Sequence, residues 1–233
     1  MKVSAIPTAR VMGTKLASLS RLLYKEQLIL PYTKESIDKA SKRLKELGPA
    51  SSWEYTIRAS APIKFVPIPD KKLGQIAPRL YIDVAVKPQE KDDKPPFNRL
   101  NATIEVVDWP EGHLQSRWHI DLANRFDNGA YQAGPLFHLQ GGGHKPKGDR
   151  KDELKISLPR WEIPPKELIL SCEMIIANFY PDKWNIIREQ RGWLDLIQIA
   201  QQLCYPAYFQ HIQNCLSKQP QSVLKALWAS EWG

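Results

Sequence analysis

The stretch RLYIDVAVKPQEKDDKPPFNRLNATIEV, residues 79–106, decides the fold that the sequence predicts. Apolar and polar residues alternate along 79–87 and again along 100–106. Successive side chains of a strand point to opposite faces of a sheet, so each segment has one apolar and one polar face. This pattern is typical of antiparallel strands, because parallel strands are covered on both faces and are apolar throughout. We therefore expect two antiparallel strands here, joined by the charged, proline-rich connection 87–96.

The chain before this stretch has a different period. Residues 1–50 carry apolar residues at helical spacing and many Lys and Arg residues, which predicts two basic helices. Thr33 provides a start signal for the second helix, and Gly48 with the proline after it provides a stop. The strand pattern then extends over residues 51–143.

The C-terminal part of the chain returns to helical spacing. A charged segment at 144–153 precedes residues 161–233, which predict a helical third that begins with a buried helix over 164–181. We therefore expect an α+β fold with a central antiparallel sheet of about four to six strands. The basic helical N-terminus and the helical C-terminal third should flank the sheet, and residues 1–233 should form a single unit.

Composition and charge restrict the class of protein. The chain has 233 residues, of which 42% are hydrophobic and 25% charged, as in ordinary globular proteins, and its apolar runs are too short to span a membrane. The net charge of +8 favours an acidic partner, such as nucleic acid or another polyanion, an anionic membrane surface or an acidic protein. Most of the excess lies in residues 1–50, where the candidate nucleic-acid-binding residues are Lys34, Lys42, Arg43 and Lys45.

Three cysteines indicate the redox environment. Cys172, Cys204 and Cys215 lie among apolar residues without metal-ligand spacing, so we expect small core residues. An odd number without a paired framework favours a reducing compartment, and we expect a cytoplasmic protein. The basic, serine-containing residues 1–25 are also compatible with a targeting segment.

A second stretch, RWHIDLANRFDNGAYQAGPLFHLQGGGH, residues 117–144, contains three of the five histidines. Residues 116–122 and 135–140 both predict strands, and the turn residues between them favour an antiparallel hairpin. Facing side chains in such a hairpin lie about 5 Å apart at Cβ. The polar face of the hairpin is expected to hold Arg117, His119, Asp121, His138 and Gln140.

One interpretation of this face is a metal site. His119, Asp121 and His138 provide two imidazoles and one carboxylate, which suit zinc, manganese or iron. The H-x-D spacing resembles the facial triad of non-haem iron oxygenases, but the double-stranded barrel of those enzymes is not visible in the predicted elements. A metal-activated water for phosphodiester hydrolysis would use the same ligands.

A second interpretation needs no metal. One of His119 and His138 would take a proton from the nucleophile and the other would give one to the leaving group, while Arg117 stabilises charge on the phosphate. Gln140 and His144 would support either site. A third interpretation is that these residues are ordinary polar partners on the exposed face of a sheet.

The leading hypothesis is a protein that acts on nucleic acid, as a metal-dependent or histidine-based phosphodiesterase or ribonuclease. The alternative is a non-catalytic module that binds nucleic acid or assembles with a protein partner. The sequence contains no G-x-S-x-G elbow, H-E-x-x-H helix, Walker loop or dinucleotide fingerprint. We therefore do not expect the enzyme classes that these motifs identify.

Overall fold

One antiparallel sheet dominates the structure, a computed structural model that describes residues 6–88, 94–142, 158–217 and 222–232. Its eight described strands are β1 (Trp53–Ile57), β2 (Ile63–Lys64), β3 (Ile68–Asp70), β4 (Gly74–Val86), β5 (Phe97–Asp108), β6 (Leu114–Leu122), β7 (Phe137–Gly141) and β8 (Trp161–Glu162). The strand order is β1-β4-β5-β6-β7-β8, with β2 and β3 also paired to β4. The predicted α+β class is confirmed, and the short strands β2, β3 and β8 extend the sheet beyond the expected range.

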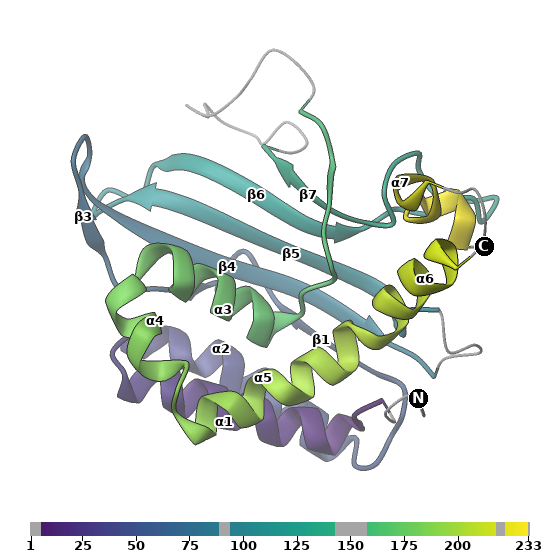
Figure 1. Cartoon of the computed structure of the whole chain (residues 1–233). Coiled ribbons are helices and arrows are strands. Elements are labelled where there is room, and N and C mark those ends of the chain that lie inside the picture. The colour runs from purple at the N-terminus through teal and green to yellow at the C-terminus, as the bar shows by residue number, and fades with distance from the viewer. Residues whose placement is uncertain (1–5, 89–93, 143–157, 218–221, 233) are drawn as a thin grey trace.

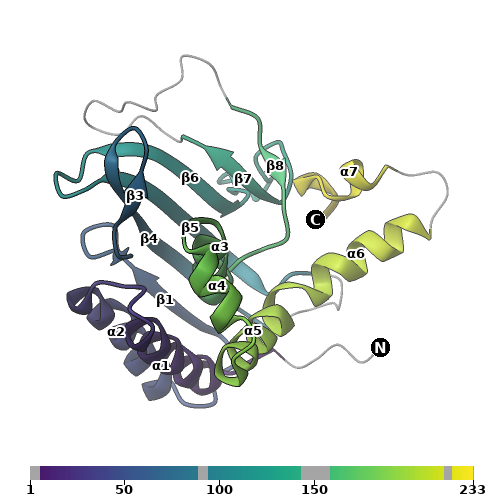
Figure 2. The same ribbon diagram turned by 60° about the vertical axis from the view of Figure 1, so that its left-hand side comes forward.

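Helices precede and follow the sheet. They are α1 (Ala9–Lys25), η1 (Pro31–Thr33), α2 (Lys34–Glu46), α3 (Leu168–Phe179), α4 (Pro181–Ile187), α5 (Arg191–Cys204), α6 (Pro206–Leu216), α7 (Val223–Ala226) and η2 (Ala229–Trp232). Figure 1 views the sheet from the side on which α3 lies, and Figure 2 shows α1 and α2 packed beside β1. In the part of the chain that is described, no helix is long and apolar enough to cross a membrane.

The apolar faces of the strands form the core. Ile82 in β4 lies opposite both Ile57 in β1 and Ala102 in β5, and all three side chains are buried. Ile104 and Trp118 continue this apolar face into β6, where α3 packs on it. The alternation of apolar and polar residues along the strands therefore gives the sheet one apolar face, and the helices pack on that face.

Local capping explains where the helices begin and end. Thr33 stands at the N-cap of α2 as expected, but its hydroxyl donates to the carbonyl oxygen of Leu30 at 2.8 Å rather than capping the helix. Gly48 follows the end of α2 with φ +68°, a conformation that favours glycine. The predicted helix over 164–181 begins at Leu168, because the buried carboxyl group of Glu167 accepts hydrogen bonds from the first turn.

The two N-terminal helices approach each other closely at a glycine. The hydroxyl of Ser41 in α2 donates to the carbonyl oxygen of Gly13 in α1 at 2.7 Å. A Cβ atom at position 13 would lie 2.8 Å from the carbonyl oxygen of Ser41. The crossing of α1 and α2 therefore requires glycine at this position.

Candidate functional site

The polar face of the β6–β7 hairpin brings the predicted site residues together. In the register of the two strands, His119 lies opposite Gln140 and Asp121 lies opposite His138. The apolar residues of the same strands pair on the other face, as in Ile120 with Leu139. The predicted hairpin and its faces are confirmed.

His119 and Asp121 form the half-buried part of this polar cluster. Nδ1 of His119 lies 3.1 Å from Oγ1 of Thr103 on β5 and 4.0 Å from Oδ2 of Asp121. The side chains of His119 and Asp121 are 22% and 26% exposed. Both side chains are thus half-buried, and Nε2 of His119 is itself buried, so their surroundings can change their chemistry.

The carboxyl group of Asp121 is perturbed by its surroundings. Burial raises the pKa of Asp121 to about 7, and the positive charge of Arg160 opposes only part of this increase. Removal from water disfavours the charged form of a carboxyl group. At neutral pH a substantial fraction of Asp121 is therefore protonated and can donate a proton.

His138 is perturbed in the opposite direction. Burial and then the positive charge of Arg160 lower the pKa of His138 to about 4. Nδ1 of His138 lies 3.2 Å from the carbonyl oxygen of Pro135. Because a carbonyl oxygen only accepts, Nδ1 carries the proton of the neutral ring, and Nε2 has the lone pair. His138 is therefore a neutral imidazole that can accept a proton at Nε2.

Arg160 is a residue of this cluster that the sequence analysis did not identify. Its Nη1 donates to the carbonyl oxygen of Ala133 at 2.8 Å, and its Nε lies 3.4 Å from Oε1 of Gln140. Its charge lowers the pKa values of both Asp121 and His138. Gln140 is therefore a partner of Arg160 on the polar face, and its supporting role stays a prediction. No local pattern around position 160 indicates this role, because the contacts depend on a segment returning to the sheet.

Arg117 lies on the expected face but is engaged by a carboxylate. Its Nε donates to Oε1 of Glu105 at 3.0 Å, and the two side chains are only 17% and 13% exposed. The hydroxyl of Tyr81 also donates to Glu105, at 3.3 Å. Arg117 is therefore held in a partly buried ion pair. Arg160 is the cation whose charge changes the pKa values of Asp121 and His138.

The proposed metal ligands are near each other without forming a ligand set. Across the described residues, no group of three or more His, Cys, Asp or Glu side chains has an arrangement that could hold a metal ion. Metal binding by His119, Asp121 and His138 therefore remains a prediction from the sequence. His144 and Gly143 lie outside the described residues.

The remaining histidines and the cysteines have local roles. Nδ1 of His113 lies 3.1 Å from a carboxylate oxygen of Asp108 in the β5–β6 turn. Nε2 of His211 lies 2.8 Å from the carbonyl oxygen of Ala226, and its ring stacks on Trp232. The cysteines are free and buried, as expected of core residues: Cys172, Cys204 and Cys215.

The basic residues predicted to contact nucleic acid lie on α2, mixed with acidic residues. Lys34 pairs with Asp38, and Lys42 lies 3.9 Å from Glu46. Arg43 pairs with Glu54 of β1 at 3.4 Å. Exposed ion pairs of this kind contribute little to stability, but they reduce the positive potential of the helix. The fourth residue, Lys45, lies on the same helix, and its positive charge helps to lower the pKa of Asp38.

Comparisons of the chain with protein-family models, with curated proteins and with solved structures gave no match.

Proposed function

We propose that the protein hydrolyses phosphodiester bonds of nucleic acid by general acid–base catalysis on the polar face of the β6–β7 hairpin. One observation carries the proposal. Asp121 and His138 are direct cross-strand neighbours, and their pKa values are shifted to about 7 and about 4, in opposite directions from the ordinary values. Pairs of titratable groups whose environments separate their pKa values are typical of acid–base sites.

The directions of the shifts assign the roles. Between pH 4 and pH 7, His138 is mainly neutral and Asp121 mainly protonated. His138 is therefore the base and Asp121 the acid. The reverse assignment requires a protonated His138 together with an ionised Asp121, which is a minor state at every pH.

The proposed reaction moves one proton at each end. Nε2 of His138 takes the proton of the attacking hydroxyl, from water or from a ribose 2′-hydroxyl, as its oxygen forms a bond to phosphorus. The bond from phosphorus to the leaving oxygen breaks, and that oxygen receives the proton of Asp121. Arg160 stabilises the negative charge that increases on the phosphoryl oxygens. His119 acts as a positioning residue for Asp121, from which it is separated by 4.0 Å.

Charge supports a phosphodiester as the substrate. A cluster with neutral acid and base groups beside a cation suits an anionic group better than a neutral ester, because Arg160 adds favourable charge. The net charge of +8 also favours association with nucleic acid. The alternative function, a binding module that uses α2, has weaker support because Lys34, Lys42 and Arg43 are in ion pairs.

The test is a pH–rate profile for cleavage of single-stranded RNA, single-stranded DNA and bis(p-nitrophenyl) phosphate in the presence of EDTA. We expect a bell-shaped profile with limbs near pH 4 and pH 7, the values set by His138 and Asp121. Asp121→Asn should remove the alkaline limb together with most of the activity, and His138→Gln should abolish activity. His113→Ala, at a histidine in the β5–β6 turn, is the matched control and should be fully active.

Three results would reject the proposal. The first is no cleavage of any of the three substrates, and the second is equal activity in Asp121→Asn, His138→Gln and the control. The third is activity that EDTA removes and one divalent metal restores, which would support the metal-dependent site instead. Circular dichroism of each variant would establish that it is folded.

A further inference from the structure

A segment near the C-terminus reaches back to the polar cluster. We call residues 222–232, which include α7 and η2, the clasp. An isolated antiparallel bridge pairs Trp228 of the clasp with Pro135. Pro135 belongs to the short segment 134–136 just before β7, and its carbonyl oxygen lies 3.2 Å from Nδ1 of His138. The clasp therefore pairs with the residue whose carbonyl oxygen accepts the hydrogen bond of the proposed base.

Two backbone hydrogen bonds flank this bridge. The N–H of Leu136 donates to the carbonyl oxygen of Leu227 at 2.9 Å, and the N–H of Ala229 donates to the carbonyl oxygen of Gly134 at 2.8 Å. On the other side of the segment, the N–H of Ala123 after β6 donates to the carbonyl oxygen of Leu136 at 2.7 Å. The two bridged residues form a non-hydrogen-bonded pair, so the carbonyl group of the bridged proline is available to the imidazole. The clasp thus holds the segment without competing for the hydrogen bond of the proposed base.

The same segment also determines where Arg160 lies. Nη1 of Arg160 donates to the carbonyl oxygen of Ala133 at 2.8 Å, and Nε lies 3.4 Å from Oε1 of Gln140. Gly134 has φ +133°, a conformation that favours glycine, and a Cβ atom there would lie 3.3 Å from Nη1 of Arg160. A shift of this segment would therefore move Arg160 and the hydrogen-bond acceptor of His138 together.

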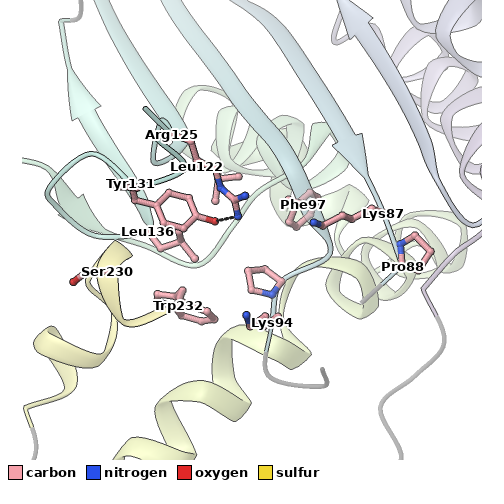
Figure 3. Close-up of a pocket in the computed structure, with 13 residues that line it drawn as sticks. Lys87, Pro88, Lys94, Phe97, Leu122, Arg125, Tyr131, Leu136, Ser230 and Trp232 are labelled. Carbon is pink, nitrogen blue, oxygen red and sulfur yellow. Dashed lines mark hydrogen bonds between the residues drawn. The ribbon is translucent and has the colours of Figure 1, made fainter. Parts of the chain in front are cut away.

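The clasp is anchored on α6 as well. The buried ring of Trp232 stacks on His211, with ring centres 3.8 Å apart, and Nε2 of His211 lies 2.8 Å from the carbonyl oxygen of Ala226. A cavity of about 550 Å³ lies between η2 and the loop after β6, and Tyr131, Leu136 and Trp232 are among the residues that line it (Figure 3). Packing between the clasp and this loop is therefore incomplete, which leaves an important share of the contact to the two backbone hydrogen bonds.

We infer that the clasp is a positioning element of the polar cluster: it holds segment 134–136 where His138 keeps its proton on Nδ1 and Arg160 faces the cluster. The catalytic consequence rests on the proposed function, because the base of that mechanism needs its lone pair on Nε2. In the other tautomer Nε2 carries the proton and cannot accept one.

The surroundings of His138 indicate what a looser clasp would change. The titratable and charged groups that face His138 are His119 and Asp121 of β6, Glu162 of β8, and Arg160. Burial and then the charge of Arg160 lower the pKa of His138, whereas the hydrogen bond to Pro135 acts in the opposite direction. A looser segment admits water and lets Arg160 move away, so the pKa of His138 should rise from about 4 towards its ordinary value of 6.5.

The variant Ala229→Pro, in the full chain, tests the inference. It removes the N–H that donates to Gly134, and proline suits the first position of a helical turn that follows an extended residue such as Trp228. Ala229→Val is the matched control, because it also enlarges the side chain but keeps the N–H. NMR of isotope-labelled histidine reports the tautomer and the pKa of His138, and His138→Gln assigns its signals.

In Ala229→Pro, the proton of His138 should move in part to Nε2 and the pKa should rise from about 4 towards 6.5, whereas Ala229→Val should keep the wild-type signals. A merely structural role of the clasp would lower stability in both variants without changing the tautomer. The acid limb of the pH–rate profile should move from near pH 4 towards pH 6.5 in Ala229→Pro. Cleavage at pH 5 should fall by up to about thirtyfold, which is the decrease in neutral imidazole for this change in pKa.

A second variant decides the matter if Ala229→Pro does not fold. Trp232→Leu removes the stacking on His211 but keeps every N–H of the clasp, and it should change the His138 signals in the same direction. A wild-type tautomer and pKa of His138 in the folded variants would overturn the inference, and so would equal changes in Ala229→Pro and Ala229→Val. The NMR measurement needs no substrate, so this outcome is separate from the test of the proposed function, which fails if the wild type cleaves nothing.

Discussion

The carboxyl group of Asp121 should destabilise the folded protein near neutral pH, and Asp121→Asn should reveal by how much. The folded protein holds this proton up to a pKa of about 7, compared with the ordinary value of 3.8. The folded state therefore binds more protons than the unfolded state between these values, and its stability falls as the pH rises through this window. About three pKa units at 1.36 kcal/mol each give about 4 kcal/mol. This is an upper limit, because the side chain of Asp121 is 26% exposed.

The assay is urea unfolding of the wild type and Asp121→Asn at unit steps from pH 4 to pH 8. The difference between their free energies of unfolding should start near zero at pH 4, grow in favour of the variant, and level off above pH 7 at up to about 4 kcal/mol. Other titrating groups, such as the buried Glu167, contribute equally to both proteins and cancel in the difference. Asp127→Asn in the exposed loop after β6 is the matched control.

A difference that does not change with pH would refute the reasoning, because it would show that Asp121 titrates alike in the folded and unfolded states. The reasoning would also be refuted if Asp121→Asn became less stable relative to the wild type as the pH rises. In that case Asp121 would be a stabilising anion, and its assignment as the proton donor would fail with it.

Three further predictions concern the fold and the choice between functions. Gly13→Ala should destabilise the protein by about 1 to 3 kcal/mol in urea unfolding, because the new Cβ would lie 2.8 Å from a backbone oxygen of α2; Gly192→Ala in α5, whose Cβ would have its nearest contact at 4.0 Å, should be neutral or stabilising. Glu167→Ala should cost about 2 kcal/mol in thermal or urea unfolding, since the first turn of α3 loses its cap and the hydroxyl of Tyr55 loses an acceptor; Glu167→Gln should cost less. Charge reversal on α2 should leave hydrolysis of bis(p-nitrophenyl) phosphate unchanged, and a loss would favour a role of α2 in the site; the residues are Lys42, Arg43 and Lys45.

The stability cost at Asp121 is consistent with a functional role. If Asp121 served stability alone, an amide of the same shape would serve better than a buried carboxyl group that weakens the folded state. Residues that lower stability are typical of sites where chemistry needs an unusual protonation state. The same argument applies to His138, because its pKa is lowered from 6.5 to about 4 and the folded protein therefore loses stability as the pH falls through this range.

Several parts of the candidate site could be predicted because they are local. The alternation in 116–122 places His119 and Asp121 on one face, and the turn residues after it indicate a hairpin that returns His138 to the same face. The Arg117–Glu105 ion pair could not be predicted, because it depends on the register between β5 and β6. A shift of one residue would have placed Glu105 on the other face.

By itself, the sequence determined the α+β class, the antiparallel strands, the order of helices and strands, and the two faces of the β6–β7 hairpin. These features depend on side-chain period and on turn and capping residues, which act over a few positions. Only the tertiary structure decided the position of Arg160 and the opposite pKa shifts of Asp121 and His138. Burial and charge at these sites come from residues far apart in the chain, and no local pattern specifies which of them meet.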